Sequence, residues 1–344
     1  MIEIKVVPLE NDCYFYGMRK IIGVASGGYT SEHAISKKSG QVVFEALKDS
    51  KYDCYQIDIN PSEWTVIDQS GIKYPLNQES FSFEKEGQPI EFDCVVNMIH
   101  GAPGENGELA AYLEERNIAH TSCDAKMAAL TYDKRACLKV ANAHGFPSAK
   151  RLNVNKGEEP SVNTVREHVG FPCFVKANRA GSSFGVYKVK NAQELPTALK
   201  CAFNEDEEIL IEAALEGREI TVGVLEWKGK VLVLPITEII SENDFFDYEA
   251  KYEGKSQEIT PANLPKAWET AAKQMAKELY TTLGLKGITR TEFIFQDGIP
   301  HLLEVNTIPG MTLQSIIPQQ AEAAGISLSE LITGVIDHSL EKKT

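Results

Sequence analysis

Residues 289–306 read TRTEFIFQDGIPHLLEVN, two short apolar runs separated by Gln296-Asp297-Gly298. The runs Thr289–Phe295 and His301–Val305 are rich in residues that favour strands, and the polar tripeptide between them is typical of a turn. The segment therefore predicts a β-hairpin whose apolar side chains pack into a core.

Four polar side chains stand within this hairpin. Residues two apart in a strand share a face, so Arg290 projects with Glu292, and Glu304 with Asn306. Charges on a buried hairpin cost free energy unless they are paired or bind a cation. Two carboxylates and an amide oxygen are hard ligands that suit Mg²⁺. The alternative is a solvated face on which Arg290 pairs with Glu292.

The register of the hairpin decides whether the carboxylates meet. Glu292 and Glu304 share a face only if even-numbered residues stand opposite even-numbered ones. That pairing requires an odd-length connection or a bulge around Gln296-Asp297-Gly298. The alternation in the second strand also predicts that Leu303 and Val305 face the core.

A glycine-rich segment, KANRAGSSFG, occupies residues 176–185. Its small residues, Gly181, Ser182 and Ser183 among them, let backbone N–H groups and hydroxyls approach phosphate oxygens, and Lys176 adds positive charge. It is not a Walker loop, because no Gly-Lys-Ser/Thr precedes a helix. Turn chemistry alone explains the glycines equally well.

Two polar loops follow predicted strands in the first third of the chain, SGGYTSE at residues 26–32 and HGAPGENG at residues 100–107. Ligands of a doubly wound sheet bind beyond the carboxyl ends of its strands. Glu32 is therefore a candidate for binding a substrate ammonium, or else a favourable charge at a helix N-terminus. His100 is a candidate substrate contact or a structural histidine.

Two later segments add further candidates. In NTIPGMT, residues 306–312, the N–H of Gly310 beside Arg290 suits a developing oxyanion, although a strand-ending turn is the plainer interpretation. In FDYEAKY, residues 246–252, a lysine and tyrosines in a predicted long loop, residues 241–260, suit a lid over a phosphate. An exposed charged loop is the alternative.

The composition excludes several classes of function. A formal net charge of −14 over 344 residues argues against a nucleic-acid partner, which needs a basic face. Seven scattered cysteines without a C-x-x-C pair indicate buried thiols in a reducing compartment rather than a zinc site. No apolar run reaches the length of a membrane span, and the first residues make a poor signal peptide. A cytoplasmic protein is expected.

The spacing of the patterns predicts the organisation of the chain. Alternating strands and helices over residues 19–121 predict a doubly wound α/β lobe, and a mixed α+β pattern follows. Residues 124–144 predict one helix, and the runs 219–227 and 230–240 predict a hairpin. The expected divisions are an N-terminal extension 1–18, the α/β lobe 19–121, a central lobe 122–213 and a C-terminal lobe 214–344 with the predicted long loop.

Taken together, these motifs resemble the D-alanine–D-alanine ligases of the ATP-grasp superfamily. The order GGYTSEHAISKKSG, HGAPGENG, TYDK, KANRAGSSFG, ILIEAALEGREIT, FDYEAKY, RTEF and LLEVNTIPGMT covers nearly the whole chain from Arg19. The resemblance implies an ATP-grasp fold, α/β and α+β, behind an N-terminal doubly wound lobe. It also implies ligation of two D-alanines through D-alanyl phosphate for peptidoglycan synthesis.

The resemblance further assigns residues to roles. ATP and two Mg²⁺ or Mn²⁺ ions are the implied cofactors, with a nucleotide set comprising Lys134, Lys176, Ser183, Glu212, Ala214, Leu215, Glu219 and Lys251. The implied metal ligands are Glu292, Glu304 and Asn306. The implied catalytic set is Glu32, Ser182, Tyr252, Arg290 and Gly310, and the substrate set is Glu32, His100, Arg290, Gly310 and Ser315.

The resemblance leaves alternatives for the acceptor and for activity itself. A D-alanine–D-lactate or D-alanine–D-serine ligase shares the fold, as does a non-catalytic nucleotide-binding protein. Tyr252 favours the dipeptide product, because D-lactate ligases usually carry His or Phe there. Glu292 stands where many relatives have Asp, Asn106 replaces a usual Asp, and the segment 120–123 departs from the common Tyr-Thr-Gly-Ser. The resemblance implies small-molecule substrates and a homodimer. It implies neither a nucleic acid nor a membrane as a partner.

Overall fold

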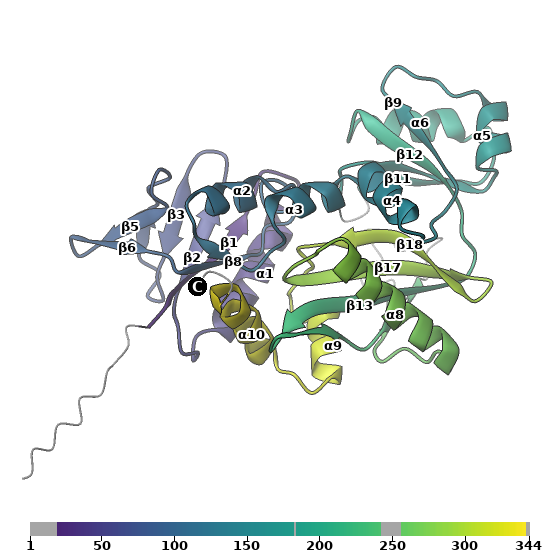
Figure 1. Ribbon diagram of the computed structural model, residues 1–344. Helices are drawn as coiled ribbons and strands as arrows, with labels where there is room; N and C mark the ends of the chain where they lie inside the picture. Colours follow the sequence, from purple (N-terminus) through teal and green to yellow (C-terminus); the bar gives the residue numbers. More distant parts are fainter. Residues whose placement is uncertain (1–18, 182–183, 242–255, 342–344) are drawn as a thin grey trace, which may run out of the picture.

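The computed structural model describes residues 19–181, 184–241 and 256–341, which form three large sheets with their helices and a two-stranded sheet, β5-β6 (Figure 1). The strands are β1 (Ile21–Gly27), β2 (Asp53–Ile59), β3 (Trp64–Ile67), β4 (Lys73–Pro75), β5 (Ser82–Lys85), β6 (Gln88–Glu91), β7 (Cys94–Asn97), β8 (Ala119–His120), β9 (Arg151–Asn155), β10 (Cys173–Ala177), β11 (Val186–Val189), β12 (Glu208–Ala213), β13 (Arg218–Trp227), β14 (Lys230–Val233), β15 (Thr237–Ser241), β16 (Ser256–Ile259), β17 (Ile288–Gln296) and β18 (Ile299–Asn306). The helices are α1 (His33–Ala46), α2 (Glu108–Glu115), α3 (Ala125–Tyr132), α4 (Lys134–Ala143), α5 (Val162–His168), α6 (Leu195–Ala202), α8 (Lys266–Thr282), α9 (Ile316–Ala323) and α10 (Leu328–Glu341).

The first sheet has the order β4-β3-β2-β1-β7-β8 and is parallel at its centre. Strand β1 is buried along nearly its whole length, as expected for a parallel strand covered on both faces. Because β1 and β7 are parallel neighbours, the loops that follow them leave the same edge of the sheet. This is the doubly wound lobe predicted from the sequence.

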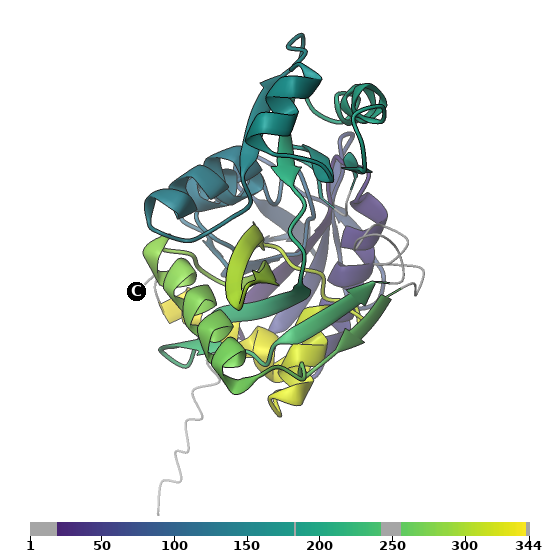
Figure 2. The same cartoon turned by 90° about the vertical axis from the view of Figure 1, so that its right-hand side faces the viewer.

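The second and third sheets are antiparallel. The central sheet, β11-β10-β12-β9, packs against α5 and α6 around a core of its own. The third sheet runs β16-β15-β13-β17-β18, with β14 also pairing with β13. In both views the central sheet lies above the third sheet (Figures 1 and 2). These two α+β units behind an α/β lobe have the arrangement expected of the ATP-grasp fold.

Strand β13 shows why the third sheet is buried on both faces. Val222 and Val224 pack into the core that contains Leu279 of α8, whereas Leu225 packs into the core that contains Ile317 of α9. Successive side chains of a strand point to opposite faces, so a strand between two helical layers must be apolar on both. The interior of β13 is correspondingly buried without a break.

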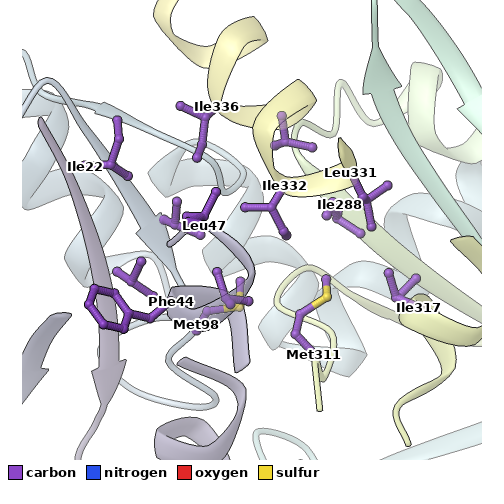
Figure 3. Close-up of a cluster of buried hydrophobic side chains, with 14 of the residues drawn as sticks. Ile22, Phe44, Leu47, Met98, Ile288, Met311, Ile317, Leu331, Ile332 and Ile336 are labelled. Carbon is purple, nitrogen blue, oxygen red and sulfur yellow. The ribbon is translucent and has the colours of Figure 1, made fainter. Parts of the chain in front are cut away.

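The first and third sheets share one hydrophobic core (Figure 3). Helix α10 lies at this junction and inserts its apolar side chains between the two sheets. The contributions from the first lobe include Ile22, Phe44, Leu47 and Met98, and those from the C-terminal part include Ile288, Met311, Ile317, Leu331, Ile332 and Ile336. The end of the chain is therefore needed to fix the first lobe against the third sheet.

Three sequence predictions differ from the structure. The helix predicted over residues 124–144 is two helices, α3 and α4, divided at Asp133. This residue has an extended ψ of 99° and its side chain accepts a hydrogen bond from the Ala136 N–H, 2.8 Å away. A carboxylate that caps a new helix competes with continuing the old one, and apolar periodicity does not reveal that competition.

The other two differences concern strands. The hairpin predicted at Lys228-Gly229 is confirmed, because β13 pairs with β14 across it, but the run 230–240 is divided into β14 and β15. Within the predicted long loop, residues 256–259 form β16, which pairs with β15. The segment 242–255, with Lys251 and Tyr252, lies outside the described residues.

We expect the Ile336→Ala variant to lower the free energy of unfolding by about 2–5 kcal/mol, because it leaves a cavity in the shared core. The Ile336 side chain is fully buried, whereas Ile72 is 54% exposed. Urea unfolding followed by circular dichroism measures the difference. Ile72→Ala is the control and should change stability by less than about 0.5 kcal/mol. Equal losses in the two variants would contradict a shared core at α10.

Candidate active site

The hairpin β17–β18 brings Glu292 directly opposite Glu304 and Arg290 opposite Asn306. At its turn, Gln296 pairs with Ile299 across Asp297-Gly298. Both turn residues have positive φ, as the common Asp-Gly hairpin turn requires. This even-length turn alone would put Glu304 and Glu292 on opposite faces.

A β-bulge corrects the register. The pairing shifts between Glu292 and Phe293, so that Phe293 faces Leu302 while Glu292 faces Glu304. A bulge or an odd-length connection was predicted around residues 296–298, and that location is wrong. Leu303 is the extra residue. It is only half-buried, and Leu302, 1% exposed, takes the core position that was predicted for Leu303.

The bulge gathers a polar cluster on one face of the hairpin. The Asn306 Nδ2 lies 3.3 Å from Glu292 Oε1 and 3.4 Å from Glu304 Oε1. Arg290 forms an ion pair with Glu292 and also donates to the Thr221 hydroxyl at 3.3 Å. Glu292 is only 4% exposed, so the solvated face considered as the alternative is excluded for this carboxylate. The three predicted metal ligands and Arg290 therefore lie together.

Lysine 134 reaches the same cluster from α4. Its Nζ lies 3.6 Å from Glu304 Oε2 and donates to the Ala180 carbonyl at 2.7 Å. Asn178 holds the start of this helix, since its Oδ1 accepts from the Arg135 N–H at 2.9 Å. The helix break at Asp133 thus places a cation between the glycine-rich segment and the carboxylates.

The second nucleotide lysine comes from the central sheet. Lys176 on β10 and Glu212 on the neighbouring β12 form an ion pair, with Nζ 2.8 Å from Oε2. Burial opposes the charge of Lys176, but the attraction of Glu212, with smaller contributions from Glu304 and Glu219, outweighs it and raises the pKa of the lysine. Lys176 is therefore a partly buried lysine whose charge is stabilised by Glu212.

Three other predicted nucleotide residues lie where the central sheet joins the third sheet. Ala214 and Leu215 follow β12 directly, and the Ala214 N–H donates to the Pro172 carbonyl at 3.2 Å. Glu219 is the second residue of β13 and stands opposite Ile294 of β17. The segment that contains Ala214 and Leu215 therefore connects the central sheet, which carries Lys176, to the third sheet, which carries Glu292 and Glu304.

The predicted ammonium ligand, Glu32, precedes α1 and is 7% exposed. The glycine-rich segment rests directly on it. A Cβ built at Gly181 would lie 2.6 Å from Glu32 Oε2, a distance that side chains do not tolerate. The first lobe and the nucleotide segment therefore meet at this carboxylate.

His100 is buried at the same junction. Its Nε2 lies 3.2 Å from the Ser39 hydroxyl, and its ring also bonds to the backbone of Ile308. Burial lowers the pKa of His100 despite the nearby charge of Glu32, so the ring is neutral at pH 7. The histidine links the first lobe to the segment that carries Gly310.

Gly310 and Ser315 lie in the turn between β18 and α9. A Cβ at Gly310 would come within 2.9 Å of the Ser315 hydroxyl. That hydroxyl accepts from the Thr312 N–H at 3.0 Å, and the Met311 N–H donates to Ser39 Oγ at 3.3 Å. These contacts fix the turn against the first lobe.

A cavity of about 30 Å³ lies where these parts converge. Its lining includes Lys134, Gly181, Glu304 and Asn306, which the sequence predicted to be close, and Glu105, which it did not assign a role. Asn178, which follows β10, and Thr221, inside β13, were also missed, because a single polar residue in or beside a strand carries no pattern. Ser182, Ser183, Lys251 and Tyr252 lie outside the described residues.

Comparison with known proteins identifies the family. A model of the D-ala D-ala ligase N-terminus matches residues 21–123, and one of the D-ala D-ala ligase C-terminus matches residues 135–337. The chain is 49% identical over 321 residues to a D-alanine–D-alanine ligase of Flavobacterium johnsoniae, covering 93% of this chain and 99% of the relative. A Christiangramia forsetii ligase of the same name is 48% identical over 326 residues, covering 95% of this chain and 100% of the relative.

Solved structures agree with these sequence matches. D-alanyl-alanine synthetase A from Vibrio cholerae superposes with a TM-score of 0.82 at 28% identity, covering 94% of this chain and 99% of that one. The VanG D-Ala:D-Ser ligase from Enterococcus faecalis gives 0.81 at 30% identity, covering 93% and 99%. A Bacillus anthracis D-alanine–D-alanine ligase complexed with ATP gives 0.75 at 27% identity, covering 94% and 98%. The chain belongs to the D-alanine–D-alanine ligase family.

Proposed function

We propose that this chain joins two D-alanines in an ATP-dependent, ADP-forming reaction, and that the polar face of the hairpin β17–β18 is its catalytic centre. The full-length match to D-alanine–D-alanine ligases supports the reaction. The observation that carries the site is the bulge at Leu303, which brings Glu304 and Asn306 to the same face of the hairpin as the buried Glu292. D-Alanyl-D-alanine is a building block of peptidoglycan, so the reaction serves cell-wall synthesis.

The hairpin cluster fits magnesium or manganese. Among residues 19–181, 184–241 and 256–341 there is no group of three or more His, Cys, Asp or Glu suited to a metal ion. A metal here must therefore use a mixed set, and Glu292, Glu304 and the amide oxygen of Asn306 supply hard oxygen donors. Two bound ions would neutralise charge on the transferring phosphate.

The cations of the chain complete the phosphate site. Lys134 and Lys176 come from two elements of the central lobe, and Lys251 is proposed as a third from the predicted lid. We assign Glu212, Ala214 and Leu215 to adenine and Glu219 to the ribose hydroxyls, with Ser183 in the glycine-rich turn. The pairing of Lys176 with Glu212 supports this assignment, because it holds the lysine in one place.

The first lobe and the turn after β18 are proposed to hold the amino acids. Glu32 binds the ammonium of the first D-alanine, and His100 contributes to the wall of its pocket. Arg290 and the Gly310 N–H stabilise the tetrahedral intermediate formed when the second amine attacks the acyl phosphate. Ser315 binds the carboxylate of the second D-alanine. Ser182 and Tyr252 are proposed to link the lid to Glu32 and exclude water.

Lobe boundaries, oligomeric state and location in the cell are also proposed. We propose lobes at 19–121, 122–213 and 214–344, with 1–18 as an extension, and a homodimer in the cytoplasm, where ATP is available. No helix in the described part of the chain has the length and apolar content to cross a bilayer.

We expect purified protein to release ADP from ATP and Mg²⁺ with D-alanine as the only amino acid. D-Serine, the acceptor named for VanG, and D-lactate are added separately to test the two alternative ligase activities. Mass spectrometry identifies the product. Absence of turnover at millimolar D-alanine, or a preference for another acceptor when both are supplied, would contradict the proposed substrate.

Glu304→Gln should lower kcat by at least about a hundredfold, because it removes one anionic metal ligand but keeps the side-chain volume. The exposed Glu322→Gln on α9 is the matched control and should stay within about twofold of wild type. ADP release measures both variants, and circular dichroism checks their folding. Wild-type activity in a folded Glu304→Gln variant would refute the metal assignment.

A further inference from the structure

Glu105 is a partly buried carboxyl that the proposed roles do not use. It belongs to the HGAPGENG loop and lines the same cavity as Lys134, Gly181 and Glu304. Lys134 and Glu32 both lie close enough to Glu105 to act on its charge, so Glu105 stands near both halves of the proposed site.

Glu105 closes its own loop by two hydrogen bonds to one residue. Its Oε2 accepts from the Gly101 N–H at 2.8 Å, and its backbone N–H donates to the Gly101 carbonyl at 2.7 Å. Gly101 has a φ of +68°, a left-handed conformation that glycine adopts without strain, so a residue with a side chain would fit poorly here. Removing the carboxyl would leave a partly buried N–H without its acceptor.

The closed loop is the surface on which the segment before α1 rests. A Cβ at Gly101 would lie 2.6 Å from the Thr30 hydroxyl, so the two residues are in close contact. The Ala102 carbonyl accepts from the Tyr29 N–H at 2.8 Å. Thr30 Oγ1 in turn accepts from the Glu32 N–H at 3.3 Å. Contacts therefore run without a gap from Glu105 through Gly101 and Thr30 to Glu32.

The surroundings of Glu105 favour a neutral hydrogen-bond acceptor over a charged side chain at this position. Burial, and then the neighbouring Glu32, raise the pKa of Glu105 to about 8, although the Gly101 N–H and Lys134 act in the opposite direction. A neutral amide of the same length can accept the same hydrogen bond from Gly101.

We propose that Glu105 is a positioning residue for the first D-alanine. Its side chain holds the Gly101 loop closed, the loop supports Thr30, and Thr30 fixes the backbone of Glu32. The inference rests on the proposed ligase function. It assigns to Glu105 no contact with substrate, and it predicts that the length and acceptor capacity of the side chain matter while its charge does not.

Three variants separate these properties. Glu105→Gln keeps length and acceptor and should retain kcat/KM for D-alanine within about threefold. Glu105→Asp keeps the charge but is one methylene short, and Glu105→Ala removes the acceptor. Both should raise the KM for D-alanine about tenfold or more, because an unsatisfied buried donor costs about 1–3 kcal/mol. The KM for ATP should stay within about twofold in every variant. The exposed Glu108→Ala in α2 is the control and should match wild type.

Hydrogen exchange supplies a readout that does not need turnover. Backbone amides of residues 28–32 and 100–105 should exchange faster in Glu105→Ala than in wild type, and Glu105→Gln should restore protection. A Glu105→Gln variant as impaired as Glu105→Ala would overturn the proposal, as would a Glu105→Ala variant with wild-type KM and exchange. Inactive wild-type protein would refute the ligase function alone, and the exchange comparison would still decide the positioning role.

Discussion

The register of one hairpin governs the chemistry of this molecule. The Asp-Gly turn sets a pairing in which Glu304 would face the core beneath α8, and the extra residue Leu303 reverses the face for the rest of β18. A buried carboxylate in that core would cost several kcal/mol. The bulge instead places Glu304 beside Glu292 and leaves the core positions on both sides of it to Leu302 and Val305. A single insertion thus satisfies the core and builds the anionic cluster.

The carboxylates of Glu292 and Glu304 lie on one face of the hairpin and repel each other, so nearby cations must compensate for their charge. Arg290 pairs with Glu292 from the same strand, and Lys134 approaches Glu304 from α4. Lys176 stays charged in the central sheet because Glu212 compensates for its burial. Each compensating cation comes from a different element: Arg290 from β17, Lys134 from α4, which packs into the core of the third sheet, and Lys176 from β10 of the central sheet. Bound metal and triphosphate would take over part of this compensation.

The sequence predicted those features that depend on local pattern. The hairpin 289–306, the doubly wound first lobe and helix α10 follow from strand alternation, turn residues and apolar periodicity, and the ATP-grasp fold followed from the order of motifs. The location of the bulge was not predictable, because Leu302 and Leu303 are adjacent leucines and either satisfies the apolar pattern. The break at Asp133 was missed because a capping carboxylate does not interrupt that pattern. The HGAPGENG pattern does not single out Glu105 as a functional residue, since its proposed role depends on a hydrogen bond across its own loop.

The distribution of cores indicates how ligands reach such an enclosed site. The first lobe and the third sheet share a core through α10, so Glu32 and the Gly310 turn belong to one rigid unit. The central sheet has a separate core of its own, and it meets Glu32 through Gly181, a residue without a side chain. Packed cores resist deformation, whereas interfaces between them can shift. Separation of the central sheet from the shared unit would open the space beside Lys176 and Glu304 and leave both of these cores intact, although it would withdraw Leu210 of β12 from the core beneath α8. Gly181 lies against Glu32, so the same separation would also open the proposed ammonium site. Entry of nucleotide and entry of D-alanine would then be coupled through the contact between Gly181 and Glu32.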